Sequence, residues 1–397
     1  MEVTRTPEFL SLNAEKLQAL IESDKLNVSC EKDVFDAVNR WYEYDAAGRQ
    51  QKLPDLIGSL RLNQLDTDFL LRKVQLLPGC EVLALRAITW TTLPTNRTMV
   101  SLKFTTPRKD VRNTSEETIL LAIGRSEGDV KIFQYDKAED EWHKYDDMEY
   151  DFSSSEMAFV DDSLIFIGGC SDIKPTNVVK SWNIKTKTWS TLPSMAQPRG
   201  WPSVISLNGS IYAIGGWTTI IQRTNSVEIY KPGNGWDFVS SMSTARSGAG
   251  AVVLNGKIFV MGGWDGSYQL KSVECYEPSS DSWTQCASMN EGHSLPGVAV
   301  SNGCIYILGS EMALSCKTVE CYDPQNNKWT KICALRDGRY GIGCVSTDDR
   351  LWAVGGIPSN SVSVYNSERD EWIEKKPIPK NGRYSCYVVA KTLFESE

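Results

Sequence analysis

The chain has 397 residues, of which 41% are apolar and 23% charged, and its formal net charge is −8. This length predicts two or three domains, and this apolar content is sufficient for a large core. The acidic balance argues against nucleic acid or a membrane surface as the main partner, because both need a concentrated basic patch.

The chain shows no sign of export. Residues 1–30 carry charges throughout, and no run of about 18 apolar residues occurs anywhere in the sequence. The eleven cysteines are an odd number in a chain without an export signal, which indicates reduced thiols. We therefore expect a cytoplasmic protein, and leave cytoskeletal or nuclear association open.

Residues 9–77 have the pattern of short helices joined by polar links. Leu17, Leu20 and Ile21 form an apolar stripe with helical spacing, which must pack against a partner helix. The predicted helix starts lie at Asn13, Ser29, Pro54 and Asp66 or Thr67. The region is predicted to be a small stack of antiparallel helices.

Several short sequence motifs of this helical region also match one known domain, in the same order. They are Phe9-Leu10-Ser11-Leu12, Asp24-Lys25-Leu26-Asn27-Val28, Glu31 with Val34-Phe35, Arg40-Trp41, Asp45 with Arg49, and Leu60-Arg61-Leu62. In these motifs the region resembles the BACK domain of the BTB–BACK–kelch (kelch-like) proteins. In that family the domain acts as a spacer.

The resemblance also implies a domain that this sequence lacks. In the family a BTB domain precedes the BACK domain and provides both dimerisation and the docking surface for a cullin scaffold. Here only a tail of residues 1–8 lies upstream, and the first helices of a complete BACK domain are missing. The chain is therefore either a fragment or isoform of a longer protein, or a protein without the docking function.

Residues 78–117 are the least regular part of the sequence. Pro78-Gly79 ends the helical pattern, and residues 91–103 have some strand character. Basic residues among Thr, Asn and Ser favour a solvated connection. We predict a linker over residues 78–117.

From residue 118 to residue 391 one pattern returns six times: an apolar strand, a glycine and later a tryptophan. The tryptophans are Trp142, Trp189, Trp236, Trp283, Trp329 and Trp372, at intervals of 47, 47, 47, 46 and 43 residues. The glycines are Gly124, Gly168-Gly169, Gly215-Gly216, Gly262-Gly263, Gly309 and Gly355-Gly356. A fixed period of this size with four short strands per unit predicts a β-propeller.

The closure of the propeller follows from the order of its strands. A strand precedes every glycine motif except the first, and residues 385–391 form a strand that no glycine pair follows. We predict that this last strand is the innermost strand of the first blade, which leaves residues 392–397 as a tail. With this register the region resembles the kelch family, including Gly262-Gly263-Trp264-Asp265-Gly266. The fold class is thus mainly β: a six-bladed kelch propeller after a small, incomplete BACK-like helical domain.

One face of the propeller is the candidate binding site. Because adjacent strands are antiparallel, the loops after the glycine pairs and the loops that lead into the inner strands lie on the same face. We call it the glycine face. Its predicted partner-binding residues are Arg199, Arg246, His293, Arg339, Arg383, Arg223, Trp201, Trp217, Trp264, Tyr268, Tyr340 and Tyr384.

These residue types suit an extended acidic or phosphorylated peptide. Arginine forms forked hydrogen bonds with carboxylates and phosphates, and tryptophan supplies large contact area. The kelch resemblance implies substrate binding at this face too. The alternative is that the recurring arginine bonds neighbouring carbonyl groups and has a structural role.

Catalysis has little support in the sequence. The chain has two histidines, His143 and His293, and no CxxC or Walker-type spacing. We expect no enzyme activity, no cofactor and no metal. The resemblance implies a substrate-recognition adaptor of a cullin-RING E3 ubiquitin ligase, with cullin binding only where a BTB domain is present in the full protein or isoform. The alternative is a kelch scaffold associated with actin or the cytoskeleton, without a ligase role.

Overall fold

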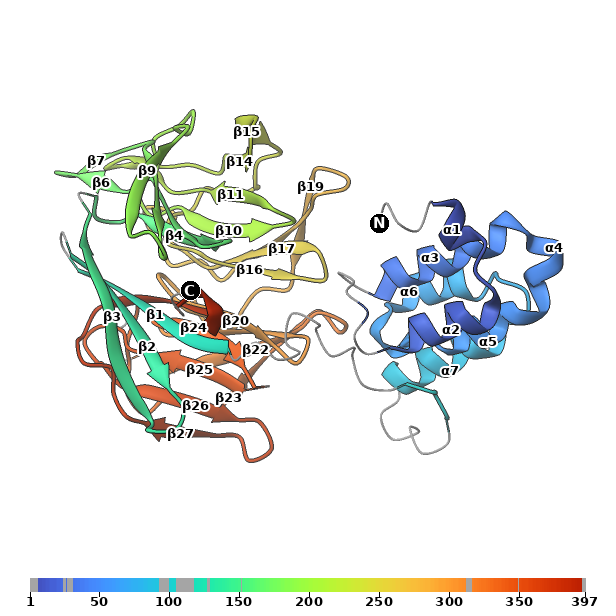
Figure 1. Cartoon of the computed structure of the whole chain (residues 1–397). Helices are drawn as coiled ribbons and strands as arrows, with labels where there is room; N and C mark the ends of the chain where they lie inside the picture. Colours follow the sequence, from blue (N-terminus) through green and yellow to red (C-terminus); the bar gives the residue numbers. More distant parts are fainter. Residues whose placement is uncertain are drawn as a thin grey trace. The chain divides into compact units, whose positions relative to one another are not determined.

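The computed structural model describes residues 6–23, 26, 31–92, 100–104, 118–126, 129–150, 152–311, 316–348 and 350–394. The chain divides into two compact units, a helical unit within residues 1–117 and a β unit within residues 118–397 (Figure 1). In the part of the chain that is described, no helix is long and apolar enough to cross a membrane.

The helical unit is a stack of short helices around one apolar core. The helices are α1 Pro7–Leu10, α2 Ala14–Glu22, α3 Glu31–Tyr44, α4 Ala46–Arg49, α5 Leu53–Gly58, α6 Thr67–Phe69 and α7 Glu81–Thr92, with the 3-10 helices η2 Gln50–Lys52 and η3 Leu62–Gln64 and the π-helix η4 Leu70–Val74. Leu17 of α2, Trp41 of α3 and Ile57 of α5 are buried in this core. The predicted cap at Asn13 is confirmed, because its Oδ1 accepts a hydrogen bond from Lys16 N at 2.9 Å. The predicted cap at Ser29 lies outside the described residues.

Helix α7 corrects the linker prediction for residues 81–92. The segment has no clear apolar stripe, and its Thr and Ile residues lower helix propensity. Ala84 and Ala87 are nevertheless fully buried in the core of the helical unit, so tertiary packing stabilises the helix. The strand character seen in residues 91–103 is also wrong at its start, because Thr91 and Thr92 end α7.

The β unit is a propeller of six four-stranded sheets. From the innermost to the outermost strand, blade 1 contains β28 Arg383–Ala390, β1 Thr118–Ser126, β2 Asp129–Asp136 and β3 Glu141–Glu149; blade 2 contains β4 Glu156–Val160, β5 Ser163–Ile167, β8 Val179–Asn183 and β9 Thr188–Leu192; blade 3 contains β10 Ser203–Leu207, β11 Ser210–Ile214, β14 Val227–Lys231 and β15 Gly235–Val239. Blade 4 contains β16 Gly250–Leu254, β17 Lys257–Met261, β18 Val273–Glu277 and β19 Ser282–Cys286; blade 5 contains β20 Gly297–Ser301, β21 Cys304–Leu308, β22 Val319–Asp323 and β23 Lys328–Ile332; blade 6 contains β24 Gly343–Thr347, β25 Arg350–Val354, β26 Val362–Asn366 and β27 Glu371–Lys375. Two small hairpins accompany blades 2 and 3. They are β6 Cys170–Ser171 with β7 Lys174–Pro175, which Figure 1 labels, and β12 Trp217–Thr219 with β13 Gln222–Arg223.

The last strand closes the propeller. β28 pairs antiparallel with β1, from Arg383 opposite Arg125 to Ala390 opposite Thr118. The innermost strand of blade 1 is therefore the last strand of the chain, and it begins two residues before the predicted range. Because the first and last strands lie in one sheet, the ring has no open seam.

The repeating tryptophans join neighbouring blades. In blade 4, Trp283 lies against Tyr276 on the adjacent strand, with 5.0 Å between ring centroids. Its indole Nε1 donates a hydrogen bond to Ser240 O of the preceding blade at 2.7 Å. Trp236, Trp329 and Trp372 make the same bond to the blade before theirs. The aromatic pairs thus fill the space between blades, as their spacing predicted.

The glycine motifs allow main chain from two blades to approach closely. Gly262 has a φ of +67°, and a Cβ at this position would lie 2.5 Å from His293 O of the following loop. We expect Gly262→Ala to lower the free energy of unfolding of the propeller by about 3 kcal/mol, because it adds a steric clash to backbone strain. Denaturant unfolding followed by tryptophan fluorescence would measure this loss.

Gly256 is the matched control for this substitution. Its φ is +73°, but a Cβ there would meet no atom within 4 Å. Gly256→Ala should therefore lose only about 1 kcal/mol, from backbone strain alone. Equal losses for the two variants would contradict the close-contact explanation.

Candidate functional site

The loops that lead into the inner strands are joined by main-chain hydrogen bonds around the centre of the glycine face. The bonds are Tyr384 N to Gly341 O (2.9 Å), Gly341 N to Leu295 O (2.9 Å), Leu295 N to Gly248 O (2.9 Å), Gly248 N to Trp201 O (2.9 Å) and Trp201 N to Ser154 O (2.8 Å). We call these six residues the collar. Each blade contributes one of them, so the collar sets the order of the loops around the mouth of the central channel.

The channel behind the collar is a cavity of about 530 Å³. Its walls come from the inner strands of all six blades, and much of the lining is apolar, as at Ala251, Val253 and Val300. Charged side chains, among them Arg125, Glu156 and Arg383, lie at the end next to the collar. The charged chemistry of the channel is therefore concentrated at its mouth on the glycine face.

Three of the predicted arginines and the predicted histidine do not reach this face. Arg199, Arg246, His293 and Arg339 are 0–1% exposed. Arg246 shows the reason: its Nη1 donates to Gly262 O at 2.7 Å, and its Nη2 donates to Glu274 Oε1 at 2.8 Å. These side chains turn inward and attach each lead-in loop to its own blade, so the predicted ring of exposed cations is wrong and the structural alternative is correct.

A buried glutamate completes this attachment in blades 3, 4 and 5. Glu274 also accepts hydrogen bonds from the main-chain N–H groups of Ser243 and Thr244, at 2.7 and 3.2 Å. Glu228 pairs in the same way with Arg199, and Glu320 with His293. Burial lowers the pKa of Arg246, and the charge of Glu274 opposes this shift. In blade 6 the equivalent position holds Ser363, which accepts from Arg339 Nη2 at 3.2 Å.

Two residues of the closing strand were also placed wrongly. Tyr384 is 5% exposed, and its hydroxyl donates to Lys380 O at 2.5 Å, so its ring is part of the core. Tyr384 and Trp201 take equivalent places in the collar. Arg383, the residue before Tyr384, is therefore equivalent to Gly200, the residue before Trp201, and not to Arg199 as the sequence predicted. This shift of one position explains why Arg383 reaches the channel mouth while Arg199 does not.

Three predicted residues meet in a hollow beside the mouth. Trp201, Tyr340 and Arg383 line a cavity of about 530 Å³ that Arg125 and Glu311 also border. The Arg383 guanidinium lies over the Trp201 ring, 5.5 Å from its centroid. Burial, and secondly the charge of Arg125, lowers the pKa of Arg383. This mouth hollow is the part of the glycine face where the prediction and the structure agree on accessible side chains.

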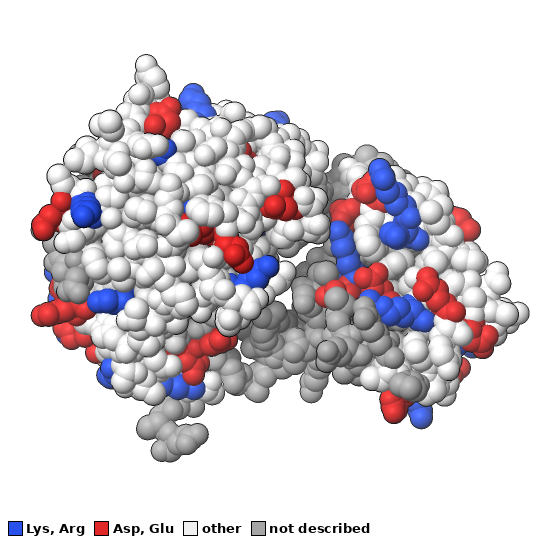
Figure 2. Space-filling model, turned by 90° about the horizontal axis from the view of Figure 1, so that it is seen from above, with Lys and Arg blue, Asp and Glu red and all other residues white. Residues whose placement is uncertain are grey.

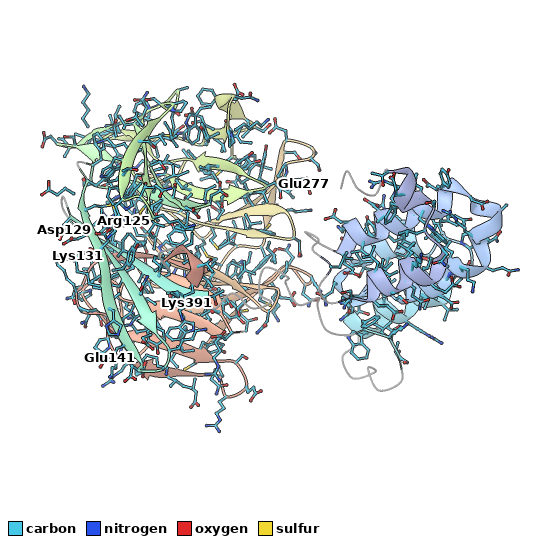
Figure 3. The ribbon with its side chains drawn as sticks, viewed as in Figure 1. Arg125, Asp129, Lys131, Glu141, Glu277 and Lys391 are labelled. Atoms are coloured by element: carbon cyan, nitrogen blue, oxygen red, sulfur yellow. The ribbon has the colours of Figure 1, made fainter. Side chains whose placement is uncertain are left out.

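Arg125 is held firmly in the same hollow. Its Nη2 contacts Glu156 Oε1 at 2.9 Å and Ser385 Oγ at 3.1 Å, and its Nη1 donates to Ser155 O. Figure 3 labels Arg125 on blade 1, near Asp129 and Lys131. Its hydrogen-bonding capacity is largely used within the propeller. Arg125 therefore shapes the hollow more than it offers a binding group.

Apolar side chains at the loop tips of blades 2, 3 and 4 form a second accessible feature. Ile173 is 70% exposed, Ile220 62%, Ile221 90% and Tyr268 74%. We call these residues the apolar tips. Tyr268 was predicted from the sequence, whereas the three isoleucines were not, because the prediction rested on arginine and aromatic residues. For two of them the sequence did contain a signal of exposed apolar residues, because the Ile220-Ile221 pair lies between two short polar stretches.

The other predicted residues are partly buried supports. Trp217 begins β12 and forms a main-chain bridge with Gly200, and Trp264 forms the same bridge with Ser247. Arg223 donates to Ile220 O at 2.8 Å and so braces the hairpin that carries two of the apolar tips. Figure 2 shows acidic and basic residues scattered over the visible surface, with no large patch of one sign.

Comparison with known proteins places this architecture in a family. The sequence model described as the KLHDC2/KLHL20/DRC7 Kelch-repeats domain matches residues 155–356, about half of the chain. The chain belongs to this kelch-repeat family. The BACK model, described as BTB And C-terminal Kelch, matches residues 1–75 of this kelch protein.

Curated relatives of the kelch chain carry kelch-like names. Human Kelch-like protein 28 is 31% identical over 234 residues, which are 54% of this chain and 40% of that protein. Mouse Kelch-like protein 17 is 33% identical over 154 residues, which are 36% of this chain and 23% of that protein. The chain spans less than half the length of these relatives. The solved structure of YjhT, with a TM-score of 0.51 and 17% identity over 59% of this chain and 86% of that chain, supports the fold alone.

The His293–Glu320 pair gives the kelch propeller a predicted acid sensitivity. Burial raises the pKa of Glu320, but hydrogen bonds from His293, Asn290 and Glu291 outweigh burial and lower this pKa to about 2. A carboxylate with a depressed folded-state pKa stabilises the protein above its ordinary pKa of 4.5, and this stabilisation is lost as the pH falls towards 2. The difference in unfolding free energy between wild type and Glu320→Gln should shrink by about 3 kcal/mol over that range.

Denaturant unfolding at several pH values would measure this difference. Asp323→Asn is a suitable control, because Asp323 also lies on β22 and bonds main-chain groups of its own turn near the surface. The difference in unfolding free energy between wild type and Asp323→Asn should change less with pH than the difference between wild type and Glu320→Gln. A constant difference between wild type and Glu320→Gln from pH 6 to 3 would contradict the assignment.

Proposed function

We propose that this protein is a substrate-recognition adaptor of a cullin-RING E3 ubiquitin ligase. In this proposal the glycine face of the propeller binds a segment of the target protein. The observation that carries it is the combination, on one face, of the mouth hollow with the apolar tips. Trp201, Tyr340 and Arg383 line the hollow, and accessible isoleucine and tyrosine side chains lie at the loop tips.

The chemistry of this face suits a protein partner. Interfaces concentrate their binding energy in a few aromatic, arginine and apolar anchors that become buried, surrounded by polar residues. Trp201 and Arg383 can act as such anchors within a concave site, and the apolar tips can be covered by the same partner. The mixed charges on the propeller give less support to a strongly charged ligand such as nucleic acid.

The ligase part of the proposal rests on the family. The BACK match and the kelch-like relatives support an adaptor role, with the helical unit as a spacer. Contact with the cullin is proposed to occur through a BTB domain of the full protein or isoform. We propose no catalytic role and a cytoplasmic location.

Affinity capture with the whole chain tests this function. The variant Ile220→Asp/Ile221→Asp changes the apolar tips, and Phe238→Ser is the control, because Phe238 is 57% exposed on the outermost strand of blade 3. We expect wild type and the control to capture specific partners that the Ile220→Asp/Ile221→Asp variant loses. Ubiquitylation of these partners should be higher with the full adaptor than without it. Identical partners for all three chains would overturn binding at this face, and recovery of actin alone would favour the cytoskeletal scaffold.

A further inference from the structure

We propose that Cys275 and Cys286 of blade 4 form a reversible oxidation site. A hydroperoxide oxidises the thiol of Cys286, and Cys275 then closes a disulfide with it. Both residues are free cysteines and both are partly exposed, so a small oxidant can reach them. The site needs no bound target segment and therefore goes beyond the proposed function.

The two cysteines are neighbours on adjacent strands. In the β18–β19 pair, Cys275 lies opposite Thr284 and Cys286 lies opposite Val273. The cysteines are therefore diagonal neighbours, and their side chains lie on the same face of the sheet. Both pack against an apolar cluster that includes Trp329 of blade 5, and their thiols are hydrogen-bonded to each other. The pair thus lies at the joint between blades 4 and 5.

This hydrogen bond gives the two thiols different roles. It raises the pKa of Cys275, and burial raises that pKa further, so Cys275 keeps its proton and donates it towards the sulfur of Cys286. The same bond lowers the pKa of Cys286 against the opposing effect of burial. Because the thiolate is the nucleophile, Cys286 is the residue that attacks the oxidant. Cys275 is then the resolving residue, in contact with the sulfur that has been oxidised.

The reaction consumes one molecule of hydrogen peroxide for each disulfide. The thiolate of Cys286 attacks one peroxide oxygen, the O–O bond breaks, and the hydroxide that leaves takes up the proton lost by Cys286 to form water. Cys286 is now a sulfenic acid. The sulfur of Cys275 attacks the Cys286 sulfur, the S–O bond breaks, and hydroxide leaves with the proton of Cys275 as a second water. The two sulfurs lose two electrons in total, and the peroxide gains them.

The edge position of β19 allows the pair to close. β19 is the outermost strand of blade 4 and pairs with β18, which ends at the residue labelled Glu277 in Figure 3. Diagonal neighbours in an antiparallel sheet have Cα atoms about 7–8 Å apart, whereas a disulfide usually joins Cα atoms about 4.4–6.8 Å apart. Closure therefore requires Cys286 to move towards β18, and an edge strand can make this movement.

The residue after Cys286 opposes that movement. Ala287 N donates a hydrogen bond to Asn327 Oδ1 of blade 5 at 2.7 Å, and Ala287 O accepts one from Trp329 Nε1 at 2.9 Å. A disulfide that closes against these bonds is strained, and strained disulfides are the easily reduced ones. The bond is therefore expected to open again in a reducing compartment.

A second pair of contacting cysteines provides an internal comparison. Cys304 of β21 and Cys321 of β22 are also hydrogen-bonded to each other. Each of these two strands is paired on both sides, β21 with β20 and β22, and β22 with β21 and β23. Neither strand can shift without breaking bonds to a neighbouring strand. The blade 5 pair should therefore close much more slowly than the blade 4 pair.

Thiol mapping on the whole chain provides a direct test. Reduced protein would be exposed to hydrogen peroxide for increasing times, the remaining thiols alkylated, and the peptides identified by mass spectrometry. We expect the Cys275–Cys286 disulfide to form at least tenfold faster than a Cys304–Cys321 disulfide, and millimolar reduced glutathione to reverse it. Equal rates for the two pairs, no Cys275–Cys286 disulfide, or a disulfide that survives glutathione would overturn the proposal.

Three variants assign the roles of the two thiols. In Cys275→Ser the sulfenic acid has no resolving thiol, so dimedone, which reacts with sulfenic acids, should label Cys286. Cys286→Ser should leave Cys275 as an unlabelled thiol. Cys333→Ser is the control, because Cys333 is partly exposed just after the outermost strand of blade 5 and should not affect the disulfide. Labelling of Cys275 in Cys286→Ser would contradict the assignment of Cys286 as the attacking residue.

Discussion

A chain that ends at Gly382 is expected to lose the cooperative folding of its propeller. This truncation removes β28, whose eight residues form the innermost strand of blade 1. The strand also bonds blade 6 through Tyr384 N and blade 2 through the Tyr387 hydroxyl. Removal of β28 exposes the inner edge of blade 1 and deletes one residue of the collar. The expected loss of unfolding free energy exceeds the roughly 5–15 kcal/mol by which a domain is typically stable. Tryptophan fluorescence during denaturant unfolding would report the loss.

A chain that ends at Ala390 is the control for this truncation. It keeps β28 and removes the terminal turn, including Phe394, whose ring lies 4.7 Å from that of Tyr145. Loss of this surface contact should cost about 1 kcal/mol and leave a cooperative transition. If the chain that ends at Gly382 unfolded at the same denaturant concentration as this control, closure by β28 would not be needed for stability.

Arg246→Ala is expected to lower the free energy of unfolding by about 4 kcal/mol, because it leaves the Glu274 carboxylate buried without its cation. Both side chains are 1% exposed, so the contacts with Glu274 and Gly262 that the variant loses lie in the interior of the blade. The variant would therefore appear as an unstable propeller before any effect on binding could be measured. Denaturant unfolding of the whole chain gives the value.

Two further variants distinguish this buried pair from a general effect of arginine loss. Arg223→Ala, on the glycine face, should cost less than 1 kcal/mol, because Arg223 is only partly buried and its side chain donates a hydrogen bond to Ile220 O, a neighbour in its own exposed hairpin. Arg246→His should keep part of the stability, since blade 5 uses His293 with Glu320 at the equivalent place. A loss for Arg246→Ala no larger than that for Arg223→Ala would show that the buried pair is not stabilising.

The architecture of the propeller was predictable because its signals are local and repeated. The same glycine and tryptophan contacts recur in most blades, as the indole hydrogen bonds of blades 3 to 6 show, so their spacing indicates the strands between them. Helix α7 had no such support: its sequence is poorly amphipathic, and its stability comes from the packing of Ala84 and Ala87. Contacts of this kind depend on the assembled core and are not visible in a short stretch of sequence.

The binding residues were harder to predict because one residue type serves two purposes. Arg246 points into its blade, whereas Arg383 lines the channel mouth. Relative to the collar residue that follows each of them, the two arginines differ by one position. A signal for the inward role was present in the sequence. Glu228, Glu274 and Glu320 recur at one position of the third strand in the blades where Arg199, Arg246 and His293 occur. A paired acid in register with the cation indicates an internal salt bridge.

The collar has a consequence for how such propellers diversify. Its hydrogen bonds use peptide groups alone, although five of its six residues, all but Tyr384, have a positive φ that restricts which side chains fit. The six blades already differ here, with Ser154, Trp201, Gly248, Leu295, Gly341 and Tyr384 at equivalent places. A substitution at Ser154 or Leu295 by a residue that tolerates a positive φ, such as Asn, can alter the rim of the channel while the hydrogen bonds of the collar persist. New target preferences can arise in this scaffold by single steps that leave its folding intact.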